Sequence, residues 1–198
     1  TLGPVDMTVP AGSIVGLIGE NGAGKSTTIR LILDMVQRDG GTVTILGRDS
    51  RTASVRAKEE IGVVLGSDGI PQCLNAVEVG KVMAGIYRNW DAGDYTAFCR
   101  KFDLPPDKKY KDYSAGMQRK LCIAVALSHH AKLLLLDEPT SSLDIHNQYQ
   151  VLQIVQELCH HDGLTAIVVI HDLNLALRFC DRFLLLRQGQ VYANGDYT

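Results

Sequence analysis

The hydrophobic positions of this chain follow two different spacings. Short apolar runs recur along the sequence, each bounded by glycine, polar or charged residues, which is typical of strands buried on both faces of a sheet. These runs occupy 14–18, 61–65, 133–136 and 166–170. Between them, apolar residues recur every three or four positions, the spacing of helices that bury one side. This alternation predicts an α/β fold with a mostly parallel sheet and helices on both faces.

Further elements follow from local signals. Alternation of apolar and polar residues at 5–9 and 42–46 predicts half-exposed strands, and the segments 183–186 and 191–193 predict a closing hairpin, so part of the β-structure is expected to be antiparallel. Helices are expected in the segments 25–34, 54–60, 114–129, 147–160 and 173–180. The histidine pairs at 129–130 and 160–161 are interpreted as solvated residues at helix ends, where they favour the dipole.

Residues 76–130 differ from the rest of the chain because their apolar positions recur almost throughout at helical spacing. We expect this block to be a helical subdomain inserted into a single domain that spans 1–198. Residues 1–75 and 131–198 then form the core of that domain. The aromatic residues Tyr87, Trp90 and Tyr95 are expected in the interior of the block, with an aromatic docking surface as the alternative.

Composition is that of an ordinary globular protein. The chain has 198 residues, of which 45% are hydrophobic and 21% charged, and a formal net charge of −2. That balance gives no electrostatic argument for nucleic acid or an anionic membrane surface. The apolar runs are too short to cross a bilayer, and the five cysteines include no CxxC pair, so buried reduced thiols are expected rather than disulfides or a zinc site. Because the chain opens at Thr1 within an expected strand, we expect an N-terminal truncation.

The loop after the first buried strand matches a phosphate-binding pattern. Residues 19–26 read GENGAGKS, a full GxxxxGK[ST] motif between an expected strand and an expected helix. Glycines let successive backbone N–H groups turn toward an anion, and the helix N-terminus adds its dipole. Lys25 is placed to reach the β- and γ-phosphates, and the Ser26 hydroxyl to ligate Mg²⁺. The predicted nucleotide contacts are Gly19, Asn21, Gly22, Ala23, Gly24, Lys25, Ser26 and Thr27; the alternative is a glycine-rich turn that binds nothing.

Two carboxylates follow the run of four leucines at 133–136. A strand buried on both faces delivers Asp137 to the carboxyl edge of a parallel sheet, where ligands bind. Asp137 can hold Mg²⁺ directly or through water. Glu138 is the candidate general base for a water that attacks the γ-phosphate. The alternative, an acidic turn at a strand end, is weakened by the phosphate loop.

Three further segments carry a resemblance to a known family. Residues 113–119 (YSAGMQR) are similar to the LSGGQ signature of ATP-binding cassette (ABC) ATPases, the nucleotide-binding domains of ABC transporters. Residues 141–144 (SSLD) resemble that family's D-loop, and His171 stands where its switch histidine does. Together with the phosphate loop and the acidic pair, these motifs fall in the family's order along nearly the whole chain. The resemblance implies an ATPase with the P-loop NTPase fold and an inserted helical subdomain.

The resemblance also implies how these parts cooperate. Two such domains pair head to tail around two Mg-ATP molecules, each between the phosphate loop of one subunit and Ser114, Ala115 and Gly116 of the other. Ser114 suits this position because it is a good N-cap and opens a helix with free N–H groups. By the same resemblance His171 acts at the γ-phosphate, and Asp144 lies at the dimer seam. The subunit would drive a transmembrane permease from the cytoplasmic face of the membrane, with no nucleic-acid partner.

The sequence departs from the family pattern in three places. The signature has Met117 where the family has a polar residue. The Q-loop glutamine is missing directly after 61–65, so Gln72 or Asp68 is the candidate for its contact with Mg²⁺ and water, and either can equally be a solvated loop residue. The aromatic residue that stacks on adenine is expected upstream of Thr1.

Other functions remain as alternatives. A non-transport ABC ATPase of the DNA-repair or translation type is the second hypothesis, although the chain has neither a long coiled-coil insertion nor a second set of motifs. A regulatory module that holds ATP without turnover is opposed by Glu138, and a P-loop kinase or GTPase by the signature. Direction stays open, since 61–82, 107–111 and the signature resemble bacterial exporter ATPases, whereas 171–195 resembles ATPases of metal-chelate importers.

Overall fold

The computed structural model describes residues 2–52, 55–66 and 69–196, and its main element is a six-stranded sheet. Along the sheet the strands are β4 (Ile61–Val64), β5 (Leu133–Leu136), β6 (Thr165–Val169), β1 (Ile14–Gly19), β7 (Arg182–Arg187) and β8 (Gln190–Asp196). The first five are parallel, and β8 pairs antiparallel with β7. The predicted mostly parallel sheet and the closing hairpin are therefore confirmed.

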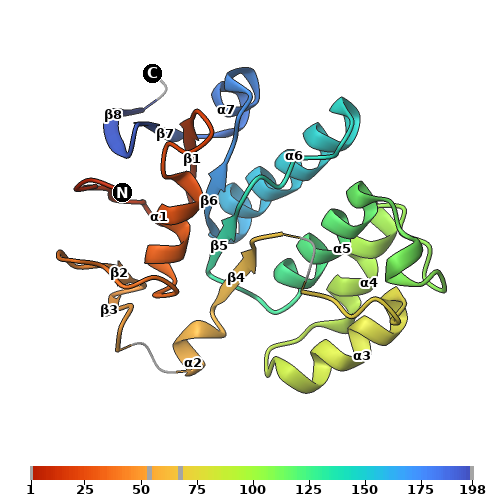
Figure 1. Cartoon of the computed structure of the whole chain (residues 1–198). Coiled ribbons are helices and arrows are strands. Elements are labelled where there is room, and N and C mark those ends of the chain that lie inside the picture. The colour runs from red at the N-terminus through yellow and green to blue at the C-terminus, as the bar shows by residue number, and fades with distance from the viewer. Residues whose placement is uncertain (1, 53–54, 67–68, 197–198) are drawn as a thin grey trace.

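Helices cover both faces of this sheet. In Figure 1, α1 (Lys25–Ile32) lies on one side, while α5 (Ala115–Leu127), α6 (Ile145–Asp162) and α7 (Leu173–Phe179) lie on the other. Alternate residues of a strand point to opposite faces, so β5 feeds two separate cores. Leu134 and Leu136 pack with α5, α6 and α7, whereas Leu133 and Leu135 pack with α1. The four consecutive leucines thus form a central strand because both of its faces are buried.

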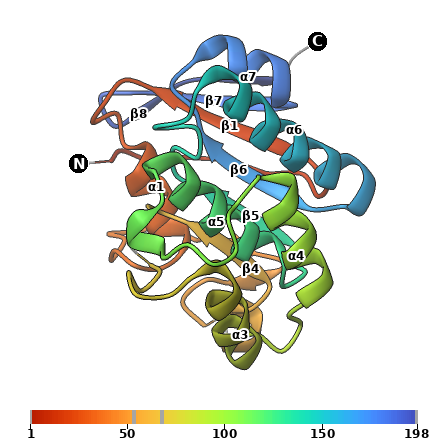
Figure 2. The same cartoon turned by 90° about the vertical axis from the view of Figure 1, so that its right-hand side faces the viewer.

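The helical block contains α3 (Ala76–Ile86), α4 (Ala92–Lys101), a short 3₁₀ turn (Tyr110–Asp112) and α5. Figure 2 shows α4 beside α5, and α3 beyond the β4 edge of the sheet. Asn75 and Glu78 form a capping box that begins α3, and the Tyr95 hydroxyl of α4 donates to the carbonyl of Ala76 at 2.7 Å. Tyr95 is buried and Tyr87 and Trp90 are half-buried, as expected for interior aromatics. The exact division of the chain at 76 and 130 stays a prediction.

The small antiparallel portion is shorter than its pattern predicts. It consists of β2 (Thr44–Ile45) paired with β3 (Arg48–Asp49), and a short helix, α2 (Val55–Lys58), follows. Residues 5–9 form no strand, although Val5, Met7 and Val9 pack half-buried against the core. Burial of alternate side chains accounts for this pattern without a strand. A strand also requires a hydrogen-bonded neighbouring strand, and 5–9 pairs with none of the described residues. The prediction of a strand there is wrong.

His129 overturns the prediction of a solvated residue at a helix end. Its side chain is only 1% exposed, and its ring stacks on Tyr87 with centroids 4.1 Å apart. The chain turns inward after α5, where Ser128 donates to the Ala124 carbonyl at 2.6 Å, so His129 covers the core while His130 remains exposed. Burial lowers the pKa of His129. His160 and His161 lie on the exposed end of α6, as expected, and within the described residues no disulfide joins any of the five cysteines.

Candidate functional site

The phosphate loop joins β1 to α1 through a backbone that requires glycine. Gly22 has φ 81° and Gly24, the N-cap of α1, has φ 106°, both in the left-handed region that side chains disfavour. The first buried helix of the fold therefore begins at Lys25, as the motif predicts. Asn21 and Gly22 are exposed, Thr27 is half-buried, and Ala23 is buried against the core.

Lys25 lies folded back over this loop. Its ammonium Nζ donates to the carbonyls of Gly19 at 2.8 Å and Glu20 at 2.9 Å, and the residue is 4% exposed. Burial lowers the pKa of Lys25, whereas the nearby carboxylates of Glu138 and Asp137 act in the opposite direction. The buried ammonium group of Lys25 can therefore bind a phosphate that enters the loop.

Ser26 and Asp137 meet across the sheet edge. The Ser26 hydroxyl donates to Oδ1 of Asp137 at 3.0 Å, although the two residues are far apart in sequence. The Asp137 N–H donates to the carbonyl of Val64 at 2.8 Å, so this residue continues the ladder between β4 and β5. The contact brings two hard oxygen donors together beside the phosphate loop, which is the ligand chemistry of Mg²⁺.

Glu138 and His171 also come together at this edge. They follow the neighbouring strands β5 and β6, and Nε2 of His171 lies 2.6 Å from Oε1 of Glu138. Glu138 adopts φ 51°, in the left-handed region that residues other than glycine seldom adopt. Both side chains remain about 40% exposed, at 42% for His171 and 38% for Glu138. Sequence reasoning identified each residue but missed their direct contact, for which the only signal was their shared position after adjacent strands.

The signature segment forms the start of α5. Ser114 is the N-cap, as predicted, and its hydroxyl accepts from the N–H of Met117 at 3.2 Å. Ser114 and Ala115 are exposed, so the helix N-terminus faces outward. A Cβ on Gly116 would meet Leu143 and the carbonyl of Ser142, which places Gly116 against the D-loop. The contacts of Ser114 and Gly116 are therefore with Met117 and the D-loop.

The structure explains the residue types at positions 117 and 144. Met117 is half-buried and packs against the main hydrophobic core, which explains an apolar residue at this point of the signature. Asp144 is the N-cap of α6 and accepts from the Asn147 N–H at 2.9 Å and from its side-chain amide at 2.7 Å. These hydrogen bonds hold the pKa of Asp144 below its usual value.

Of the two Q-loop candidates, the structure describes Gln72 alone. Gln72 is exposed in the turn before α3, and its carbonyl accepts from the N–H of Lys111 at 3.2 Å. Asp68 lies outside the described residues. The assignment of either residue to Mg²⁺ stays a prediction.

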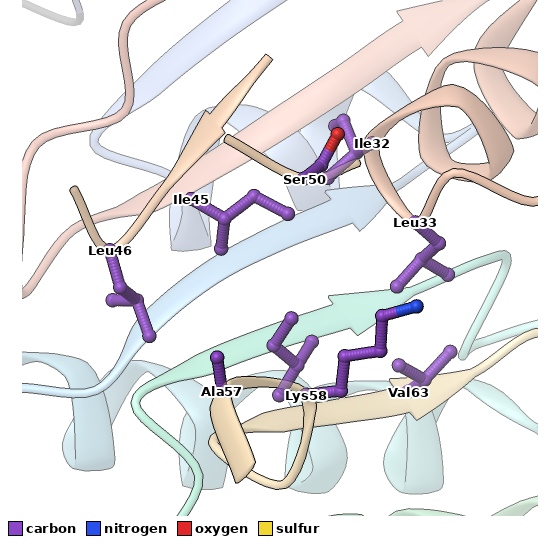
Figure 3. A pocket seen from close by; sticks show the side chains of 9 residues that line it. Ile32, Leu33, Ile45, Leu46, Ser50, Ala57, Lys58 and Val63 are labelled. Atoms are coloured by element: carbon purple, nitrogen blue, oxygen red, sulfur yellow. The ribbon is translucent and has the colours of Figure 1, made fainter. Parts of the chain in front are cut away.

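An apolar hollow lies elsewhere, between α1, the β2–β3 hairpin and α2 (Figure 3). Ile32, Ile45 and Ala57 are among the side chains that line it. None of the predicted nucleotide contacts faces this hollow, so the candidate site is identified by its chemistry and not by concavity.

Comparison with known proteins agrees with this geometry. The family model described as ABC transporter matches residues 2–141, and one described as AAA domain, putative AbiEii toxin, Type IV TA system, matches residues 109–178. The phosphonates import ATP-binding protein PhnC 1 of Rhodopseudomonas palustris is 36% identical over 96% of this chain and 74% of its own length. The hemin import ATP-binding protein HmuV of Rhodopseudomonas palustris is 35% identical over 96% of this chain and 77% of its own length.

Solved structures extend the comparison to three dimensions. The dimeric structure of MJ0796, a bacterial ABC transporter cassette, superposes with a TM-score of 0.88 at 26% identity, over 100% of this chain and 90% of that one. The dimeric post-hydrolysis state of the MJ0796 cassette bound to ADP and Pi gives a TM-score of 0.86 at 26% identity over the same shares. Within the described residues, no helix is long and apolar enough to span a membrane. The fold, the site and the family model together establish that this chain belongs to the ABC transporter family, as an ATP-hydrolysing nucleotide-binding subunit.

Proposed function

We propose that this subunit binds ATP with the loop at 19–27 and hydrolyses it with Glu138 as the general base. The observation that carries the proposal is the convergence of Lys25, Asp137, Glu138 and His171 at the carboxyl ends of β1, β5 and β6. Ligands bind at this edge of parallel sheets. Backbone N–H groups of the glycine-rich loop and the N-terminus of α1 would bind the phosphates, and Lys25 would supply positive charge.

The Ser26 hydroxyl and the Asp137 carboxylate would hold Mg²⁺. Their 3.0 Å contact already assembles two oxygen ligands, and the remaining positions suit phosphate oxygens and water. When bound, the ion would neutralise charge on the β- and γ-phosphates. The side chains of this chain do the rest: they position the phosphates and the attacking water.

Glu138 is suited to take a proton from water. Its second carboxylate oxygen is left for the water while Oε1 contacts Nε2 of His171 at 2.6 Å. This contact fixes the orientation of both side chains, and their partial exposure leaves room for a substrate at the edge of the sheet. A positioned base of this kind contributes about 10²- to 10⁴-fold to a rate.

A second copy of the chain would complete each site. Ser114, Ala115 and the N-terminus of α5 would form an anion site, and the exposure of Ser114 and Ala115 leaves it open to a second subunit. Head-to-tail pairing brings that site onto the phosphate of the partner, with Asp144 near the seam. Support comes from the dimeric cassettes that share this fold.

The functions of several relatives indicate uptake as the direction of transport. Several similar proteins are phosphonates import ATP-binding proteins, and another is a hemin import ATP-binding protein. We propose that this subunit drives an importer by docking on a transmembrane permease at the cytoplasmic face of the membrane. Because those substrates have different chemistry, no class of cargo follows from the resemblance.

The test of the hydrolytic role is Glu138→Gln, which keeps the shape of the side chain and removes its basicity. The variant should bind Mg-ATP as the wild type does, accumulate an ATP-bound dimer in size-exclusion chromatography and release phosphate at least about 100-fold more slowly. Wild-type turnover in the variant would contradict the base assignment. Affinity purification of the subunit from detergent-solubilised membranes tests the transport role. A stoichiometric apolar permease supports it, and a ribosomal or DNA-bound assembly would contradict it.

A further inference from the structure

An arginine on the signature helix reaches the turn that carries Glu138. Arg119 lies in α5, just over one turn beyond the N-cap Ser114. Its guanidinium donates from Nη2 to the hydroxyl of Ser141 at 3.1 Å and, over a longer 3.4 Å, from Nη1 to the carbonyl of Asp137. The two acceptors flank Glu138 in sequence, so one side chain spans the turn.

The hydroxyl of Ser141 passes this contact on to Glu138. It accepts from Arg119 and donates to the Glu138 carbonyl at 2.9 Å, and the Ser141 N–H donates to the same carbonyl at 3.1 Å. A hydroxyl can donate once and accept twice, so both bonds form together. A continuous chain of hydrogen bonds therefore runs from α5 to the backbone of the general base.

The turn needs such support because its backbone is strained. Glu138 at φ 51° and Ser142 at φ 66° are left-handed residues without the freedom of glycine. Conformations of this kind cost free energy and persist only where the surroundings hold them. Pro139 and Thr140 are buried between them, which anchors the middle of the turn but leaves its two ends to other contacts.

Arg119 forms no ion pair with the described residues. Among the described residues no carboxylate lies within ion-pair distance of its guanidinium. A rigid planar donor that presents several N–H groups is well suited to bridging two fixed oxygens. Neither the signature nor the acidic pair, taken as separate motifs, accounts for this bridge.

We infer that Arg119 is a positioning residue for hydrolysis, which holds the Glu138 turn in register with the signature helix. The inference rests on the proposed function of Glu138 as general base. Arg119 acts through Ser141 and the backbone and does not touch the nucleotide. It links the helix that begins at Ser114, the proposed contact with ATP of the partner, to the base of the chain's own site.

The test is Arg119→Met in the full chain, with ATPase rates measured over a range of Mg-ATP concentrations. The expected result is a kcat lower by about 10- to 100-fold, the scale of a small misplacement of a catalytic group, with KM little changed. Arg119→Lys, which keeps one charged donor, should restore part of the rate. Because Arg119 and Ser141 act as one unit, Ser141→Ala combined with Arg119→Met should be no slower than the slower single variant.

Arg178→Met is the matched control. Arg178 lies on α7, where its guanidinium lies over the ring of Tyr149 in α6, 5.1 Å from its centroid, and within the described residues it has no hydrogen bond to the turn. It should leave kcat near that of the wild type. An unchanged kcat in Arg119→Met, a loss confined to KM, or additive losses with Ser141→Ala would each overturn the inference. If Glu138→Gln hydrolyses ATP normally, the proposed function fails and this inference with it; if only Arg119→Met is unaffected, this inference alone fails.

Discussion

Replacing Lys25 by methionine should affect folding and nucleotide binding very differently. Lys25 is 4% exposed, and its Nζ donates to the carbonyls of Gly19 and Glu20 at 2.8 and 2.9 Å. Methionine keeps the aliphatic stem and removes the charge. The folded protein then loses two charge-assisted hydrogen bonds but no longer buries a cation, whose desolvation also lowers the pKa of Lys25. These effects oppose each other, so the free energy of unfolding without nucleotide should change by about 1 kcal/mol or less.

Binding of Mg-ATP has no such compensation. The ammonium group would exchange its two carbonyl acceptors for phosphate oxygens that carry negative charge. Losing a charge-assisted hydrogen bond costs about 1.5–3 kcal/mol. A loss of about 2 kcal/mol or more of binding free energy raises the dissociation constant of Mg-ATP by about 30-fold or more.

Calorimetric titration of Mg-ATP and urea unfolding without nucleotide measure the two effects separately. Lys120→Met is the matched control, since Lys120 is also a buried lysine, 7% exposed, and donates to Oδ1 of Asn147 in α6 at 2.7 Å. Its loss should leave the ATP affinity of the monomer unchanged. Equal affinities of Lys25→Met and the wild type would refute the reasoning, and so would an equal loss in both variants.

Two further predictions concern the metal site and the packing of β4 against its neighbours. Ser26→Ala removes the hydroxyl that donates to Asp137 at 3.0 Å, so the Mg²⁺ concentration for half-maximal ATPase activity should rise by about tenfold or more; an unchanged magnesium titration would rule out this hydroxyl as a ligand. Gly62→Ala should destabilise the fold by about 1–3 kcal/mol in urea, because its Cβ would lie 2.7 Å from the carbonyl of Ala126 and 2.9 Å from Leu134. Gly85→Ala, where a Cβ meets nothing within 4 Å, should instead raise stability slightly; similar changes in both variants would contradict the packing argument.

Local signals predicted most of the elements and part of the site. The runs at 14–18 and 133–136 became parallel strands because an apolar run without alternation is stable where both faces are buried. The run at 61–65 also became a parallel strand, but β4 lies at the edge of the sheet and its Val63 is exposed, so the expectation of burial on both faces is wrong there. The glycines at 22 and 24 and the N-cap Ser114 were predictable because each meets a demand of the backbone within a few residues. The phosphate loop needed no tertiary information for the same reason.

Predictions failed or stayed open where a partner distant in sequence decides. The alternation at 5–9 indicates which side chains are buried but not whether a neighbouring strand supplies hydrogen bonds, and none of the described residues does. His129 looked like a solvated helix end because nothing near it in sequence predicts the ring of Tyr87 above it. Gln72 remains a candidate because its one backbone contact, with Lys111, assigns no role to its side chain, and Asp68 remains one because it lies outside the described residues.

The sequence by itself therefore determined the fold class, the phosphate loop, the acidic pair and the order of the family motifs, since these depend on residue type at short spacing. Only the tertiary structure decided which of these residues touch. The contact between Glu138 and His171, the pairing of Ser26 with Asp137 and the reach of Arg119 to Ser141 each join residues from different elements. Strand order and helix packing set those distances, and no local pattern along the chain encodes them.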